Sequence, residues 1–117
     1  MSTKMEDYIV KTNSTQWKLL KEEGIDTKGI YIKTLRFDES GRPPSFLLKF
    51  EAGASYPYHN HPAGEELFVL EGACIIEGVT LEKGDYLYTP PGFKHSVTTT
   101  TGCILYFIVP EEVEILS

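Results

Sequence analysis

Residues Gly53–Gly72 read GASYPYHNHPAGEELFVLEG, and this stretch decides what fold and what chemistry to expect. It has a glycine at each end, two histidines one residue apart, and a Pro-Ala-Gly bend followed by two glutamates. In a strand, residues i and i+2 point to the same face, so His59 and His61 should project side by side. The bend ends that strand, and a tight reversal there would bring Glu65 back beside His61.

The third histidine of the chain lies in a second stretch of similar character, GDYLYTPPGFKHSVTT, from Gly84 to Thr99. The two prolines at 90–91 stiffen the corner that delivers His95 to the start of a new strand. Neutral imidazoles and a carboxylate on neighbouring positions form a ligand set for a divalent transition metal. The predicted ligands are His59, His61, Glu65 and His95. Glu66 replaces Glu65 if the turn runs one residue longer, although the spacing to Gly72 favours Glu65.

The rest of the chain has a β pattern. Residues 29–40, 44–53 and 95–110 alternate apolar and polar residues or are rich in β-branched and aromatic residues. Turn residues recur roughly every ten residues, which is typical of an antiparallel sandwich or barrel. The sequence predicts one all-β domain over residues 1–117, with a core at roughly 28–110. At most one short helix is expected, at residues 13–24, where Trp17 could equally open an edge strand.

Composition excludes several classes of partner. Eleven Lys and Arg against 17 Asp and Glu give a net charge of −6, so nucleic acid and anionic membranes are poor partners. No apolar run reaches the ~18–20 residues of a membrane span, and the first residues do not resemble a signal peptide. We therefore expect a cytoplasmic protein, in which Cys74 and Cys103 are reduced thiols that serve as small core residues.

The two stretches together carry a family resemblance. G-x5-H-x-H-x3-E-x6-G, from Gly53 to Gly72, and G-x5-P-x-G-x2-H, from Gly84 to His95, resemble the two motifs of the cupin superfamily. The second motif often ends with asparagine four residues after the histidine, where this chain has Thr99, and that change costs a polar contact rather than a ligand. The resemblance implies a single antiparallel jelly-roll β-barrel with one metal ion in its mouth.

The resemblance also implies a pocket and an assembly. Aromatic residues near the motifs are expected to line a mostly apolar pocket above the metal, and the candidates are Phe46, Tyr56, Tyr58, Tyr88 and Phe93. The runs FLLKF and ELFVL are apolar on both faces, so something should cover the outside of the barrel. In small cupins a second subunit usually does so, and we expect a homodimer that binds a small molecule.

Two functions remain open at this level. Similarity to single-domain cupins of the acetylacetone-cleaving type implies an oxygenase-type enzyme acting on a diketone or enolate-like substrate. The metal would be Fe, Zn, Mn, Ni or Co, the four residues would be ligands, and no catalytic acid or base can be named. The first motif also resembles the cupin half of ChrR-type anti-sigma factors, which implies a zinc-binding sensor instead. Those proteins also carry a separate N-terminal zinc-binding domain with Cys and His ligands, for which we expect no counterpart within these 117 residues.

Overall fold

The computed structural model describes residues 3–41 and 44–116, and in this part of the chain the fold is all-β. The helical residues there form two short 3-10 helices, η1 (Met5–Tyr8) and η2 (Thr12–Ser14), and no helix is long and apolar enough to cross a membrane. The strands are β1 (Lys18–Leu19), β2 (Ile30–Arg36), β3 (Ser45–Phe50), β4 (Ser55–Asn60), β5 (Glu65–Ile76), β6 (Val79–Glu82), β7 (Tyr86–Thr89), β8 (Lys94–Thr98), β9 (Cys103–Ile108) and β10 (Glu114–Ile115). Every strand pair is antiparallel, which confirms the predicted architecture.

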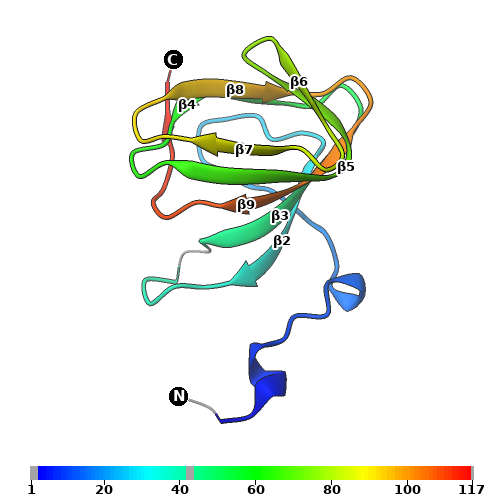
Figure 1. The fold of residues 1–117 in the computed structure, drawn as a ribbon, viewed down its shortest axis with the longest axis vertical. Coiled ribbons are helices and arrows are strands. Elements are labelled where there is room, and N and C mark those ends of the chain that lie inside the picture. The colour runs from blue at the N-terminus through cyan, green and yellow to red at the C-terminus, as the bar shows by residue number, and fades with distance from the viewer. Residues whose placement is uncertain (1–2, 42–43, 117) are drawn as a thin grey trace.

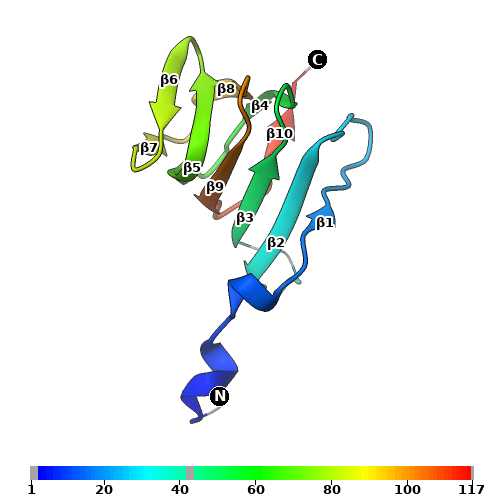
Figure 2. The same cartoon turned by 90° about the vertical axis from the view of Figure 1, so that its right-hand side faces the viewer.

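β5 joins the two sides of the barrel. The strand order is β1-β2-β3-β9-β5-β8-β4-β10, with β6 and β7 also paired to β5. The first part of β5 pairs with β7 and β9, and its last residues pair with β6 and β8. The sheet therefore curls around a common interior, while η1 and η2 extend away from it (Figures 1 and 2).

Gly72 makes the bend in β5 at which this change of partners occurs. Its φ is +71°, and a Cβ built there would lie 2.2 Å from the carbonyl oxygen of Gly102. Positive φ is found at Gly53, Gly84 and Gly92 as well, as expected from the motifs. Gly72 is nevertheless inside β5 and not at a strand end, because the strand continues through the bend into the second side of the barrel.

Thr99 stabilises the same corner. Its hydroxyl donates to the carbonyl of Ala73 at 2.7 Å and accepts from the backbone N–H of Gly102 at 2.9 Å. These contacts connect the end of β8 to the bend in β5 and to the start of β9. The Thr99 hydroxyl therefore links the backbones of neighbouring strands, and neither of its two hydrogen bonds involves a predicted metal ligand.

The candidate helix at residues 13–24 does not form, since residues 13–14 belong to η2 and residues 18–19 form β1. Lys18 and Leu19 pair with Ile32 and Tyr31, so the edge-strand alternative is the correct one. The Trp17 ring lies under two ammonium groups from neighbouring strands, with Lys33 Nζ at 4.6 Å and Lys49 Nζ at 5.3 Å from its centroid. These contacts depend on β2 and β3 being in place, which is why local helix signals did not reveal them.

The interior between the two sides of the barrel is lined by apolar side chains. Its most deeply buried apolar residues are Ile30, Phe50, Leu67, Val69, Cys74 and Leu105. Cys103 belongs to the same cluster, both cysteines are free thiols, and a hydrogen bond between them raises the pKa of Cys74. The two cysteines therefore serve as core residues, as their apolar surroundings in the sequence suggested.

Candidate metal centre

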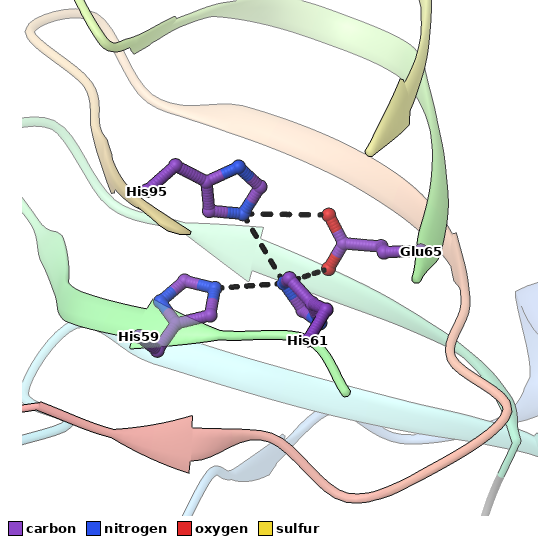
Figure 3. Close-up of side chains that lie close together, drawn as sticks. All are labelled: His59, His61, Glu65 and His95. Atoms are coloured by element: carbon purple, nitrogen blue, oxygen red, sulfur yellow. Dashed lines mark hydrogen bonds and ion pairs between the residues drawn. The ribbon is translucent and has the colours of Figure 1, made fainter. Parts of the chain in front are cut away.

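Four buried side chains, three from residues 59–65 and the fourth from β8, converge at one end of the interior (Figure 3). His61 Nε2 lies 2.9 Å from His59 Nε2, 3.2 Å from His95 Nε2 and 2.9 Å from Glu65 Oε2. His95 Nε2 lies 3.6 Å from Glu65 Oε1. One ligand atom from each residue falls within 4.8 Å of all the others. The structure thus brings together all four residues that the sequence selected.

Backbone pairing explains how the two motifs meet. His59 on β4 is the direct partner of His95 on β8. The carbonyl of His61 accepts two N–H groups at 3.1 Å, from Gly64 within its own turn and from Gly92 in the second motif. The first bond closes the tight reversal that returns Glu65 to the cluster, and the second holds the turn against the loop that carries His95.

A β-bulge sets which residues of β4 face inward. The register with β8 shifts between Tyr56 and His59, so these two residues, three apart, both point into the barrel. Their rings meet edge to face with centroids 4.9 Å apart. Tyr58 points outward as a result, whereas strict alternation would have put it on the same face as Tyr56.

The cluster has the donor chemistry of a cation site. A neutral imidazole nitrogen carries either one proton or one lone pair, yet His61 Nε2 faces two imidazole nitrogens and a carboxylate oxygen at once. His59 Nδ1 lies 2.7 Å from the Pro57 carbonyl, to which it must donate, so the lone pair of His59 is on Nε2 and directed at the cluster. Glu65 Oε1 is buried without a hydrogen bond to the described residues. A metal ion among these lone pairs would satisfy them together.

The protonation states of His59 and His95 also favour metal binding by the cluster. Burial lowers the pKa of His59 to about 4 and that of His95 to about 3. Both imidazoles are therefore neutral at neutral pH, which is the form that binds a metal. Burial raises the pKa of Glu65, and the hydrogen bond from His61 opposes that shift. His59 and His95 could thus supply neutral nitrogens to a divalent ion held by the cluster.

The structure separates the two adjacent glutamates. Glu65 is buried in the cluster, while Glu66 faces the outside of β5, where it accepts a hydrogen bond of 2.7 Å from the Tyr86 hydroxyl. Because neighbouring residues of a strand point to opposite faces, only one of the two can reach the histidines. Glu65 is the residue in place.

A cavity of about 700 Å³ opens against the cluster, and His59, His61 and Glu65 form part of its wall. Two of the five candidate lining residues, Phe46 and Tyr56, are in its wall. The other three candidates, Tyr58, Tyr88 and Phe93, are 46%, 55% and 57% exposed and lie outside the lining. Tyr58 on β4 and Tyr88 on β7 face the outer surface of the barrel, and Phe93 lies in the loop before β8.

Two segments that the motifs do not include complete the cavity wall. One follows β1 and contributes Leu20–Glu23, and the other precedes and includes β10, with Glu112, Val113 and Ile115. The Tyr56 hydroxyl donates to Glu22 Oε2 at 2.5 Å, which ties the first segment to β4. No motif spacing pointed to these residues; their only signal was a short apolar or acidic run near each end of the chain.

Solved structures share this fold. A putative acetylacetone dioxygenase from Methylibium petroleiphilum PM1 superimposes with a TM-score of 0.80 at 20% identity, over 100% of this chain and 85% of that one. The polyketide cyclase RemF from Streptomyces resistomycificus gives 0.74 at 20% identity, over 93% and 84%. An acetylacetone dioxygenase from Acinetobacter johnsonii gives 0.74 at 19% identity, over 93% and 75%. At these identities the likeness shows the cupin fold.

Two curated relatives match part of the chain. The DNA damage-repair/toleration protein DRT102 of Arabidopsis thaliana is 38% identical over 61 residues, which is 47% of this chain and 20% of that protein. The dimethylsulfoniopropionate lyase DddQ of Ruegeria pomeroyi is 35% identical over 60 residues, 47% of this chain and 30% of that protein. This chain therefore spans less than a third of either relative. The family model of the ChrR cupin-like domain matches residues 5–113, and the chain belongs to that family.

Proposed function

We propose that this cupin binds one divalent transition metal through His59, His61, Glu65 and His95 and acts as a small oxygenase-type enzyme. The observation that carries the proposal is that the ligand set opens onto a cavity of about 700 Å³. A purely structural metal site would gain nothing from such a cavity. That volume is within the ~300–1,000 Å³ of typical small-molecule sites.

Each part of the site has a role in this proposal. The metal, when bound, would supply a Lewis acid with positions for an oxygen donor of the substrate, provided that its coordination number exceeds four. The four ligands hold the ion and do not transfer protons. Phe46, Phe107 and other apolar lining residues exclude water from the bound molecule. A diketone or enolate, which can bind a metal through two oxygens, suits such a site.

The first prediction concerns the metal and the reaction. Protein purified without chelators or a histidine tag should carry one five- or six-coordinate iron, manganese, cobalt or nickel ion per chain, read by elemental analysis and X-ray absorption. Small diketones or enediols should then be consumed together with O2, measured with an oxygen electrode and by loss of the diketone absorbance. Metal in place with no O2 uptake for any such substrate would contradict the oxygenase proposal, and loss of substrate without O2 would favour a lyase.

A zinc-binding sensor is the second candidate, because the family is that of the ChrR cupin-like domain. Four protein ligands fill a tetrahedral zinc site and leave no open position. Four-coordinate zinc bound by these residues alone would favour the sensor over the enzyme. The cavity would then hold a signal molecule that does not bind the metal.

We also propose a homodimer formed through the outer face of β5, β7 and β9. Phe68 pairs in register with Tyr86 on β7 and with Tyr106 on β9, so three aromatic side chains share this face. Glu66 lies at one end of the face and Lys49, on β3, lies toward the other. A two-fold axis through the face would set Glu66 of one copy against Lys49 of the next, which gives a self-complementary surface.

Light scattering at micromolar concentration should give twice the mass of one chain. Phe68→Lys should shift the protein to the monomer, because it places a charge in the centre of the apolar face. Val79→Lys is the matched control, since Val79 is 60% exposed on the β6 hairpin and should leave the dimer intact. A monomeric wild-type protein, or a dimer that survives Phe68→Lys, would contradict this interface.

A further inference from the structure

Beyond the metal ligands, the polar part of the cavity wall is acidic. Glu22 and Glu23 come from the segment after β1, and Glu112 comes from the segment before β10. Glu23 and Glu112 are exposed and Glu22 is half-buried, which places these carboxylates toward the solvent end of the cavity. Lys21 is the one basic side chain among the described lining residues.

These carboxylates have no ion-pair partner in the part of the chain that the structure describes. Among residues 3–41 and 44–116, no lysine or arginine forms an ion pair with Glu22, Glu23 or Glu112. Glu22 accepts a hydrogen bond from the Tyr56 hydroxyl, and the Tyr56 ring packs against His59. The Tyr56 phenol ring therefore bridges the Glu22 carboxylate and the metal cluster. A small molecule bound in the cavity is long enough to reach both.

The charges do not cancel when a metal is added. Among the described lining residues, Glu65 and the three outer glutamates supply four negative charges, and Lys21 with a divalent ion supplies three positive ones. The inner wall is apolar, with Leu48, Phe50 and Val109 among its residues, so charges in the cavity are screened less than in water. The electrostatic potential in the outer half of the cavity is therefore negative, while the metal site at the inner end is positive when the ion is bound.

We propose that the cavity selects small organic molecules that carry an oxygen donor at one end and a positively charged group, such as an ammonium, at the other. The oxygen donor would face the metal cluster, and the cationic group would lie beside Glu22 and Glu112. Molecules with a carboxylate or phosphate in place of the cationic group are rejected by the same carboxylates. This inference rests on the metal centre of the proposed function and adds the substrate class.

Binding of three matched hydroxamates to the Ni(II)-loaded protein tests the inference. They share the chelating group and differ in the tail, which is aminopropyl, propyl or carboxyethyl. Isothermal titration calorimetry at low salt should show the aminopropyl compound binding at least about tenfold tighter than the carboxyethyl compound, with the propyl compound between them. The ratio should fall as salt is raised, because outer carboxylates are screened by ions.

Glu112→Gln and Glu22→Gln should each reduce that ratio by several-fold. Glu111→Gln is the matched control, since Glu111 is exposed next to Glu112, does not line the cavity, and changes the net charge equally. Equal binding of all three hydroxamates, tighter binding of the carboxyethyl compound, or the same response to Glu111→Gln would overturn the inference while leaving the metal centre standing. Failure of all three compounds to bind would instead refute the open metal site of the proposed function.

Discussion

His61→Ala is expected to lower the affinity for a divalent metal by more than about a hundredfold. Removing a residue that only hydrogen-bonds a metal ligand already lowers metal affinity ~10–100-fold, and His61 is proposed to be a ligand itself. His61 is the member of the cluster whose Nε2 lies within 3.2 Å of an atom of each of the other three residues. Removing it leaves a gap in the centre of the ligand set that the remaining side chains cannot close. The barrel should still fold, because its apolar core is made by other residues.

Titration of the apo variant with Ni(II) or Zn(II), followed by calorimetry, measures the loss, and circular dichroism checks the fold. Glu65→Gln and Glu66→Gln form a matched pair for the same measurement. The first removes a ligand charge from the cluster, and the second changes an outward residue bonded to Tyr86. Unchanged affinity in His61→Ala, or equal losses in the two glutamine variants, would refute the assignment. An unfolded His61→Ala protein would show that the site also supports the fold.

Gly72→Ala should destabilise the protein by at least about 3 kcal/mol. A φ of +71° costs a residue with a Cβ ~1–2 kcal/mol. The new methyl group would also lie 2.2 Å from the Gly102 carbonyl oxygen and 3.0 Å from Cys103 Cα. Both are backbone atoms of the neighbouring strand, so the clash can be relieved only by moving β9 away from the bend in β5.

Urea denaturation of Gly72→Ala beside Gly53→Ala separates the two causes. Gly53 has a φ of +84°, and a Cβ there would have no atom within 4 Å. The control should therefore lose only the conformational cost of ~1–2 kcal/mol. If the two variants lost equal stability, the close approach of β5 and β9 at Gly72 would not be a constraint on the fold.

Local chemistry explains why the sequence predicted the metal cluster. Residues 59–65 place three ligands within a strand end and one tight turn, whose geometry follows from the Pro-Ala-Gly bend. The segment between Gly72 and Gly84 is equally local: Glu77 and Gly78, both with positive φ, form the tight turn between β5 and β6. His95 required the family resemblance as well, since nothing local indicates that β8 pairs with β4.

The sequence by itself determined the all-β class, the grouping of His59, His61 and Glu65 and the glycines of the turns, because each depends on spacing along a few neighbouring residues. Only the tertiary structure decided which aromatics face the cavity, since a bulge in β4 turned Tyr56 inward and Tyr58 outward. It also decided that residues 18–19 form an edge strand and that Glu22 and Glu112 meet at the cavity. Those outcomes arise from contacts between segments far apart in the chain, which no local pattern records.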